Sequence, residues 1–576
     1  MTEEKAKTTS ANGVSRRQFI TGTVGGVVVG AVVGAAAGSF GFPKTITQMQ
    51  TETQTQTQTQ TQTQTQTQTQ TLTQTTTSVT TAQPWLPASW DQTADVVVVG
   101  DGFAGLNAAM YAHDAGSSVL VLEKMDQAHE GGTSKVCGGV IYSPLSAAQG
   151  EAYIATKEVG QLTDSTIINA LSQGLIDNVT AIKNLGGTVS AFSTSATGVL
   201  NVLTINGANA LGGGLLYGFF RNQASTRNIN VLYNTQATSL VQNSNTKEIL
   251  GVTATSNGNT INIKANKGVV LATGAIDYNT DMQSQFLQGY PVAAWGGLGN
   301  TGDGIKMAQK VGADVWHMTH PASVSAGQAL RVPDYPYTVG TPSGYGIGNN
   351  YIWVDKKGNR FVSESAGSAA FEYLTQFDST TGTYLRIPAW IIFDDTARAK
   401  GPFVNATTID GWFLTYSGYT WSKDNSAEIA KGWITKSDSI ADLATAIAAD
   451  TDNQVSGTPL MTSAALQATV TRFNGFVTAG SDTDFGRPAS SLAQIQTAPF
   501  YAIKVWPSAE CTKGGPRRNA GCQIVDPSQN PIPRLYGAGI GGSFWGSAGV
   551  GGGNIAEALF TGRTAGTNVA ALTPWT

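Results

Sequence analysis

The sequence of 576 residues has little charge, few cysteines and no haem-attachment motif. Charged residues make up 12% of the chain and the formal net charge is -4, which gives no electrostatic reason to expect a nucleic-acid partner. The three cysteines, Cys137, Cys511 and Cys522, are too few for a disulfide framework and lack the spacing of a zinc or iron-sulfur site, so we expect no metal. Because no CxxCH motif occurs, electrons must be exchanged with a separate molecule.

The N-terminal segment has a pair of arginines ahead of a long uncharged stretch. "SRRQFI", Ser15 to Ile20, precedes the weakly hydrophobic, glycine-rich "TVGGVVVGAVVGAAAGSFGF". This order resembles a twin-arginine export signal, a route that carries folded proteins and suits one that binds its cofactor before export. An ordinary transmembrane anchor is the alternative, since about 20 apolar residues can span a bilayer. We expect residues 1–43 to be this signal, cleaved or kept as a membrane anchor, and the folded part to be extracytoplasmic.

Residues 51–81 alternate threonine and glutamine and contain almost nothing apolar. A period of two suits a strand, but both alternating residues are polar, so neither face has anything to bury. We expect residues 44–93 to form a disordered stalk. The threonine density also suits O-glycosylation, and aggregation of a glutamine-rich segment is the alternative.

The segment "DVVVVGDGFAGLNAAMYAHDAGSSVLVLEK", residues 95–124, predicts a buried strand, a tight turn, a helix and a second strand. In the turn, Gly100 permits the chain reversal and Gly102 lets backbone amides approach a diphosphate at the helix N-terminus. Gly105 allows the helix to lie close on the strand. Glu123, at the end of the second strand, is placed to accept hydrogen bonds from a ribose. These features in register predict a dinucleotide-binding fold.

Three further segments predict more contacts with the same ligand. "EGGTSKVCGGVIYSP" is a second glycine cluster, "KGVVLATGAID" is a strand that ends in glycine, and "LYGAGIGGSFWGSAGVGGGNIAEALFTGRTAG" runs strand, loop, helix. Because loops from distant parts of one sheet would converge on one ligand, we expect an extended cofactor, FAD rather than NAD. The expected cofactor contacts are Gly100, Gly102, Phe103, Ala104, Gly105, Glu123, Lys124, Gly132, Thr133, Ser134, Gly138, Gly139, Ala237, Thr273, Gly274, Asp303, Gly539, Gly553, Asn554 and Ile555.

Other segments carry a resemblance to a known family: "TGDGIKMAQKVGADVWHM", "VDKKGNRFVSES", "TVTRFNGFVTAGSDTDFGRP", "APFYAIKVWP" and "TKGGPRRNAGCQIVD". With the glycine loops they resemble, over roughly residues 94–568, the flavoprotein family of fumarate reductases, urocanate reductases and 3-ketosteroid dehydrogenases. The resemblance implies an α/β protein with a discontinuous Rossmann-like FAD-binding domain at 94–310 and 485–576. An α+β cap (substrate) domain at 311–484 is expected to interrupt it.

The resemblance also implies how FAD is held. Relatives with covalently bound FAD have a histidine shortly before the glycine pair that matches Gly138 and Gly139. The corresponding "GGTSKVC" contains none, so we expect FAD to be non-covalent.

The family's catalytic residues are largely missing at the matching positions. The arginine that follows "RFVNE" in fumarate reductases is replaced in "RFVSESAGSAA", and "HHTMGG" becomes "ECTKGG", with Cys511 where a substrate-binding histidine is expected. The arginine of "HGANRLGGN", and the C-terminal tyrosine of the steroid dehydrogenases, both fall at Gly549. We therefore exclude fumarate as the substrate. A pocket emptied near Gly549 would admit something bulkier or differently charged.

The candidate catalytic residues are Tyr142, His320 and Arg517. Tyr142 could face the flavin as a proton donor or carbonyl ligand, or be a buried tyrosine bonded to backbone. His320 could be an acid or a substrate ligand. Arg517, with Arg518, could hold a carboxylate or order the loop beside the flavin. Cys511 could be a redox thiol or a small packing residue.

The sequence and its resemblance together predict an exported FAD-dependent oxidoreductase acting on CH-CH or C=C bonds. Hydride would pass between flavin N5 and a carbon beta to a carbonyl or carboxylate of a small-molecule substrate, and an external redox protein or quinone would supply or remove electrons. A ketosteroid-type 1,2-dehydrogenase is the alternative enzyme. A non-catalytic surface flavoprotein in electron transfer is the alternative of another class, and a surface adhesin would leave the nucleotide-binding loops unexplained.

Overall fold

The computed structural model describes residues 85–157, 164–319, 321–322, 328–331, 339–340, 345–365, 370–404, 419–546 and 551–575. They belong to one of the two units into which the chain divides, Thr80–Thr576. The predicted export signal, most of the predicted stalk, His320 and Gly549 lie outside these residues. Within the described ranges, no helix combines the length and apolar character that crossing a membrane requires. Nor do the histidine, cysteine and acidic side chains of these ranges gather into a metal site.

The first sheet is built on parallel strands that are buried on both faces, as expected for runs of valine and leucine. Val96 and Val98 of β1 face one hydrophobic core, and Val97 and Val99 face another. The strand order is β24-β25-β10-β1-β2-β7, with β9 and β8 added to β10 in antiparallel fashion. The bounds are β1 Gln92–Val99, β2 Val119–Leu122, β7 Asn230–Leu232, β8 Thr235–Gln242, β9 Ile249–Ser256, β10 Asn259–Leu271, β24 Gln523–Val525 and β25 Pro531–Gly537.

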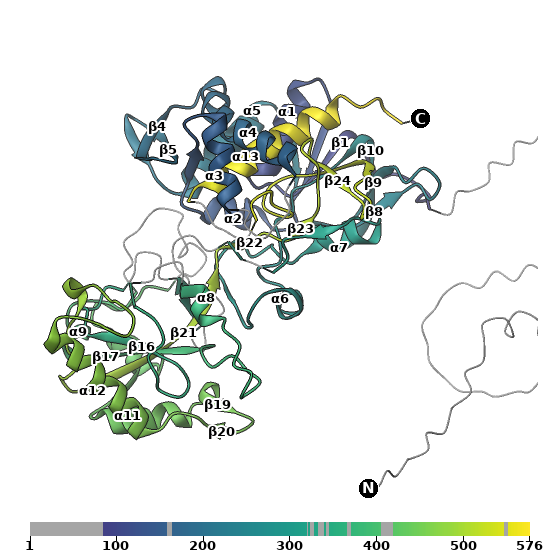
Figure 1. Ribbon diagram of the computed structural model, residues 1–576. Helices are drawn as coiled ribbons and strands as arrows, with labels where there is room; N and C mark the ends of the chain where they lie inside the picture. Colours follow the sequence, from purple (N-terminus) through teal and green to yellow (C-terminus); the bar gives the residue numbers. More distant parts are fainter. Residues whose placement is uncertain are drawn as a thin grey trace, which may run out of the picture. The chain divides into compact units, whose positions relative to one another are not determined.

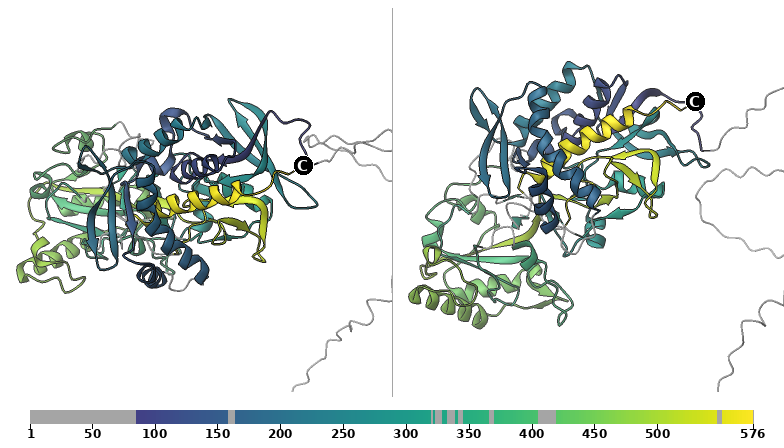
Figure 2. Two further views of the ribbon diagram at one scale, coloured as in Figure 1. Left: turned by 90° about the horizontal axis from the view of Figure 1, so that it is seen from above. Right: turned by 45° about the horizontal axis from the view of Figure 1, so that its top comes forward.

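Two helices from opposite ends of the chain pack together against this sheet. α1, Phe103–Asp114, and α13, Gly553–Ala570, lie side by side in all views (Figures 1 and 2). They approach closely because Gly562 has no side chain: a Cβ there would lie 2.3 Å from the Ala104 carbonyl oxygen. The remaining helices of this part are α2 Gly132–Val136, α3 Ala147–Lys157, α4 Ser165–Asn184, α5 Gly213–Thr226, α6 Thr280–Phe286 and α7 Asp303–Lys310.

A small antiparallel sheet follows the second glycine cluster. Its order is β3-β5-β4, with β6 paired to β5. The bounds are β3 Val140–Ser143, β4 Val189–Ser195, β5 Gly198–Ile205 and β6 Ala208–Ala210. The structure therefore places "VIYS", directly after Gly139, on a strand whose geometry is fixed by β5.

A second large sheet has the order β15-β14-β21-β17-β16, with β11 and β18 also paired to β21. Its strands alternate between two cores: Trp353, Ile391 and Phe393 face one, while Ile352 and Ile392 face the other with α11 and α12. The bounds of its strands are β11 Ala293–Ala294, β14 Gln328–Leu330, β15 Val339–Gly340, β16 Tyr351–Val354, β17 Ala389–Asp394, β18 Thr435–Ser437 and β21 Phe500–Ala509. A separate two-stranded sheet consists of β19 Gln454–Val455 and β20 Thr458–Pro459. The helices of this part are α8 Ala370–Leu374, α9 Asp395–Arg398, α10 Ser426–Ala430, α11 Ile440–Ala449 and α12 Ser463–Ala479.

The strand β21 corrects the predicted domain boundary at residue 485. Residues from Phe500 to Val505 pair with β17, in the segment predicted to form the cap, while Ser508 and Ala509 pair with β11, in the segment predicted to form the FAD-binding domain. After it come β22 (Cys511–Thr512), paired with β13 (Pro321–Ala322), and β23 (Gly515–Pro516), paired with β12 (Val315–Trp316). The prediction missed this because strand pairing across about a hundred residues leaves no local mark in the sequence.

Residues 85–93 are part of the folded unit, which corrects the predicted end of the stalk. The Trp90 ring lies 6.5 Å from the ring of Trp575, and the Asp91 N–H donates to the Asn262 carbonyl (2.8 Å). Two aromatic side chains at this end of the segment give it an apolar surface to bury, unlike the threonine and glutamine repeat before it.

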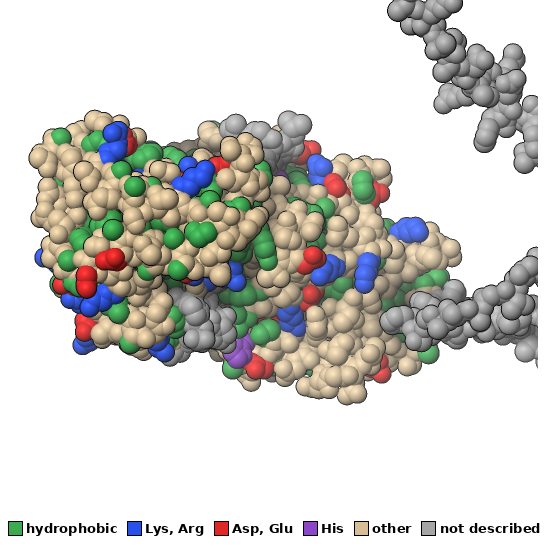
Figure 3. All heavy atoms as spheres, turned by 90° about the horizontal axis from the view of Figure 1, so that it is seen from below, with side chains coloured by type: hydrophobic (Ala, Val, Ile, Leu, Met, Phe, Trp, Pro, Cys, Tyr) green, Lys and Arg blue, Asp and Glu red, His purple; other side chains and the backbone are tan. Residues whose placement is uncertain are grey.

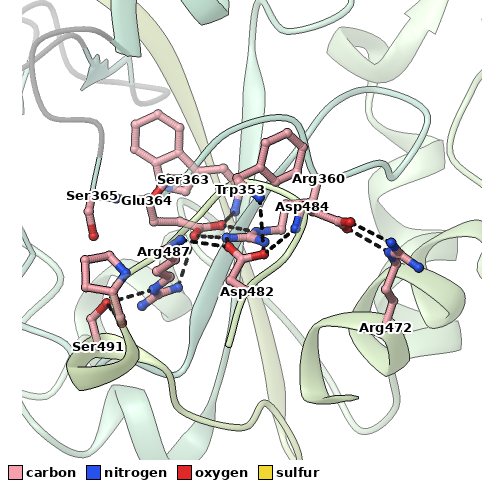
Figure 4. Close-up of polar contacts among 12 residues, drawn as sticks. Trp353, Arg360, Ser363, Glu364, Ser365, Arg472, Asp482, Asp484, Arg487 and Ser491 are labelled. Carbon is pink, nitrogen blue, oxygen red and sulfur yellow. Dashed lines mark hydrogen bonds and ion pairs between the residues drawn. The ribbon is translucent and has the colours of Figure 1, made fainter. Parts of the chain in front are cut away.

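Two of the segments that carry the family resemblance meet in a buried ion network (Figure 4). The Arg360 guanidinium donates to Glu364 (2.7 Å) and to Asp482 (2.8 Å), and Arg487 donates to Glu364 (3.2 Å). These four side chains are at most 5% exposed. "RFVSES" and "DTDFGRP" are therefore joined by charge, which gives their matching residues a structural role.

The acid Asp482 illustrates the strength of this pairing. Burial alone would raise its pKa, but the guanidinium of Arg360 and the N–H of Arg487 outweigh burial and lower the pKa to about 2. Since the folded-state pKa lies below the ordinary value of 3.8, the stabilisation is present above that value and is lost as the pH falls toward 2.

The charged side chains on the face drawn in Figure 3 are scattered. Lys and Arg alternate with Asp and Glu among apolar and uncharged groups, and no large patch of one sign is visible on that face.

Candidate cofactor and active site

The predicted glycine loops line one cavity, although they come from four distant parts of the chain. Most of the predicted cofactor contacts are in its lining: Gly100, Gly102, Phe103, Ala104, Glu123, Lys124, Gly132, Thr133, Ser134, Gly138, Ala237, Thr273, Gly274, Asp303, Gly539, Asn554 and Ile555. Gly105, Gly139 and Gly553 are not in the lining. The sequence analysis did not name several others that line it, among them Asp101, Met125, Cys137, Gln236, Asn300 and Glu510.

The turn between β1 and α1 is closed so tightly that one position excludes any side chain. A Cβ on Gly105 would lie 1.8 Å from the Gly100 carbonyl oxygen, and Gly100 itself has a φ of +100°. Gly105 therefore sets the distance between helix and strand from outside the cavity, while Gly102 faces it. The Phe103 N–H in this turn donates to Ser134 Oγ (2.9 Å), which fixes the second glycine cluster beside the first.

The acid predicted to bind a ribose, Glu123, is in the lining of the cavity. Glu123 accepts from the Met125 N–H (2.8 Å) and from the Asp101 N–H (3.3 Å). Beside it, the Lys124 ammonium donates to Thr301 Oγ1 (2.7 Å) and pairs with Asp303 (2.9 Å).

The second residue of the glycine turn, Asp101, is an acid that the sequence analysis left without a role. Its carboxylate accepts from the Gly131 N–H (2.8 Å) and the Tyr217 hydroxyl (3.1 Å), and so ties the turn to the next loop. Burial raises the pKa of Asp101, and burial together with the Asp101 charge raises the pKa of Glu123 to about 8. Two buried acids thus lie where a dinucleotide is expected.

We expect the affinity for FAD to increase as the pH rises through about 8. Below that pH the Glu123 carboxyl is protonated in the cofactor-free protein and is a poor acceptor for ribose hydroxyls. Because its folded-state pKa lies above the ordinary 4.5, its contribution to the stability of that protein is present below 4.5 and lost as the pH rises through 8. FAD fluorescence titrations from about pH 6 to 9 measure the dependence. A Glu123→Gln protein should give a flatter profile, and an unchanged slope would contradict the assignment.

The part of the cavity around Cys137 and Asn554 fits a flavin ring. The lining there includes Gly138, Val140, Leu200, Cys511 and Ile555. The Asn554 amide nitrogen donates to Cys511 Sγ (3.7 Å), while its buried Oδ1 has no donor among the described residues. A buried acceptor without a partner calls for a ligand N–H, which a flavin ring carries. With the tight glycine turns and Glu123, this donor set fits FAD.

The cysteines in the lining are protonated thiols. Burial raises the pKa of Cys137 to about 12 and the pKa of Cys511 well above its ordinary value. Since the thiolate is the reactive form, the redox interpretation of Cys511 is disfavoured and the packing interpretation is favoured.

Two of the three candidate catalytic residues lie away from the cavity. The Tyr142 hydroxyl donates to the Thr197 carbonyl (2.6 Å), and burial raises the pKa of Tyr142 to about 12. Arg517 lies over the ring of Trp316 (5.2 Å) and 3.5 Å from Asp314. Neither residue is in the lining, so the geometry favours a structural role for both. The third, His320, is outside the described residues.

The comparisons with known proteins agree with this geometry. The family model "FAD binding domain" matches residues 95–555. The chain is 29% identical to the digoxin reductase of Eggerthella lenta over 551 residues, covering 84% of this chain and 88% of that protein. It is 28% identical to a probable fumarate reductase of Shewanella frigidimarina over 504 residues, covering 84% of this chain and 76% of that protein.

The fold has solved counterparts as well. The 3-ketosteroid delta1-dehydrogenase of Sterolibacterium denitrificans is similar with a TM-score of 0.67 at 22% identity, covering 83% of this chain and all of that one. A match of the family model over most of the folded chain, and a cavity that fits the cofactor, lead to one conclusion: the protein belongs to the FAD-binding domain family of flavoproteins.

Proposed function

We propose that the protein is an exported FAD-dependent oxidoreductase that transfers a hydride between flavin N5 and a carbon beta to a carbonyl or carboxylate. The observation that carries this proposal is the single cavity lined by four glycine loops, with Glu123 in one part of it and Cys137, Glu510 and Asn554 in another. When bound, FAD supplies a ring that can accept or release hydride.

The chain's own residues would hold and shield this group. Backbone N–H groups at the start of α1 are available to a diphosphate, and Glu123 is available to the ribose. Val140, Leu200 and Ile555 make the other part of the lining apolar, which excludes water from the reacting atoms. We propose that FAD is held non-covalently. Of the candidate catalytic residues, only His320 stays a proposal, and it rests on the resemblance.

The relatives support the class of reaction. Two of them are named as reductases, and they match most of the folded chain at 28% and 29% identity. An identity of 28% or 29% supports an inference about the class of reaction more strongly than one about the substrate. We therefore propose an activated C=C or CH-CH bond without assigning either relative's substrate.

Export and the electron partner belong to the same proposal. "SRRQFI" supports the twin-arginine route, with the N-terminal segment cleaved or kept as an anchor. The lack of a CxxCH motif supports an external redox protein or quinone as the electron partner.

The test is the reoxidation of reduced enzyme without oxygen. Purified yellow protein is photoreduced and mixed with conjugated enones and enoates, and with ferricyanide as an artificial acceptor. We expect at least one conjugated carbonyl compound to restore the flavin spectrum. Saturated ketones added to the oxidised protein test the opposite direction, that of a dehydrogenase. If ferricyanide alone reoxidises the flavin and no ketone reduces it, the electron-transfer alternative is correct.

A further inference from the structure

The cavity has few permanent cations with which to bind a carboxylate. The segments outside the described residues between 158 and 550 contain neither Lys nor Arg, so every such residue from 85 onward has a described position. Among the described residues, Lys124 is the one Lys or Arg in the lining, and it is occupied by Thr301 and Asp303. A dianionic substrate would therefore meet no Lys or Arg side chain of the lining near Cys137 and Cys511, although the charge of the buried Lys513 acts on Cys511.

Three cations, Lys513, Arg517 and Arg518, follow closely after Cys511 in the chain, but each donates to or pairs with a protein acceptor. None of them is in the lining. The pairs are Lys513 Nζ with the Gly546 carbonyl at 2.8 Å, Arg517 with Asp314 at 3.5 Å, and Arg518 with Glu557 at 2.5 Å. Lys513 and Arg518 are also fully buried, so moving either one toward a ligand would break a bond inside the protein.

The charged residue that does line this part of the cavity is an acid, Glu510. Its backbone is held between β21 and β22: the Ala509 carbonyl accepts from the Trp295 N–H (3.2 Å), and the Thr512 N–H donates to Asp277 (2.5 Å). A Cβ on Gly296 would lie 2.3 Å from the Glu510 carbonyl oxygen, so this loop packs directly on it. The structure therefore fixes the backbone at Glu510, a residue of the lining.

The negative charge of Glu510 acts on the thiols of both cysteines of the lining and raises their pKa values. Burial is the main reason that the pKa values of Cys137 and Cys511 are raised; the negative charge of Asp277 adds to the shift of Cys511, and that of Glu510 adds to both shifts. Around Glu510 and the two cysteines the lining is apolar, with Val140, Leu200, Ile555 and Ala558. This part of the lining, which would also hold the flavin ring, thus combines one carboxylate with an apolar surface.

We propose, on the basis of the proposed function, that Glu510 determines specificity by accepting a hydrogen bond from a hydroxyl, N–H or cationic group on an otherwise apolar conjugated carbonyl substrate. A carboxylate has about four acceptor sites, so it can serve a substrate donor as well as protein groups. Hydrogen bonds to an ionised acceptor are stronger than neutral ones, and a donor-bearing substrate gains that advantage. Substrates that carry a carboxylate meet a like charge instead and bind poorly.

The binding test uses the oxidised protein, so it does not depend on turnover. 4-Hydroxybenzylideneacetone and benzylideneacetone differ by one phenolic hydroxyl, and cinnamate adds a negative charge. Changes in the flavin spectrum give Kd for each. We expect Glu510→Gln to raise the Kd of the hydroxylated ketone at least about tenfold, equal to about 1.4 kcal/mol of binding free energy, and to leave the Kd of benzylideneacetone nearly unchanged. Cinnamate should bind the variant more tightly than the wild type. Equal effects on the two ketones would overturn the inference.

Glu372→Gln is the matched control, because Glu372 is an exposed acid outside the lining. It should reproduce the wild-type constants for all three ligands. Turnover by photoreduced enzyme separates the inference from the proposed function. If the ketones bind with the expected selectivity but never reoxidise the flavin, the proposed function fails and the recognition by Glu510 stands. If the ketones reoxidise the wild type and Glu510→Gln equally well, the proposed function stands and the inference fails.

Discussion

A Gly105→Ala protein is expected to purify without the yellow colour of a flavin. The added methyl group would lie 1.8 Å from the carbonyl oxygen of Gly100 and 2.9 Å from its carbonyl carbon. Both atoms are backbone, so α1 can make room only by moving away from β1 and distorting the turn that lines the cavity. Overpacking costs about 1–3 kcal/mol even where side chains can give way. We expect the bound FAD, measured from the flavin-to-protein absorbance ratio, to fall by at least about tenfold.

The matched control is Gly218→Ala, in the interior of α5. A Cβ on Gly218 meets nothing within 4 Å. Alanine favours a helix over glycine by about 1 kcal/mol, so this protein should keep its FAD and unfold at a slightly higher temperature. A Gly105→Ala protein that binds FAD as well as the Gly218→Ala protein would show that helix and strand need not be so close.

The second large effect is expected from Glu364→Gln in the buried ion network (Figure 4). The substitution keeps the shape of the side chain but leaves Arg487 without its anion and Arg360 with only Asp482. Removing one partner of a buried ion pair typically costs about 3–5 kcal/mol. We expect the free energy of unfolding, measured by urea denaturation, to fall by that amount. Tryptophan fluorescence suits the measurement because Trp353 donates its backbone N–H to Glu364.

An exposed pair in the same region provides the control. Arg472 pairs with Asp484 at 2.5 Å, but its side chain is 63% exposed. Exposed ion pairs contribute little to stability, so Arg472→Ala should leave the denaturation midpoint nearly unchanged. Flavin absorbance reports separately on the FAD-binding part during the same experiment. Equal midpoints for Glu364→Gln and Arg472→Ala would contradict a stabilising role for the network.

The sequence by itself determined the cofactor-binding half of the molecule. The turn after β1 needs glycine at fixed spacings and an acid after the next strand, so Gly100, Gly102, Gly105 and Glu123 could be assigned from local order alone. The cofactor contacts of the glycine clusters that follow other strands of the sheet could likewise be predicted from local order. Because the carboxyl ends of parallel strands meet at one edge, clusters far apart in the chain were expected to meet at one cavity.

The tertiary structure alone decided what surrounds that cavity. The sequence left Tyr142 either facing the flavin or buried and bonded to backbone, and pairing between β3 and β5 brings its hydroxyl to the Thr197 carbonyl. The resemblance drew attention to Cys511, while the neighbouring Glu510 supplies the charge in the lining. The sequence could not separate these outcomes, because a side chain's direction and the cations that remain available to a ligand depend on strand pairing and ion pairs between distant segments.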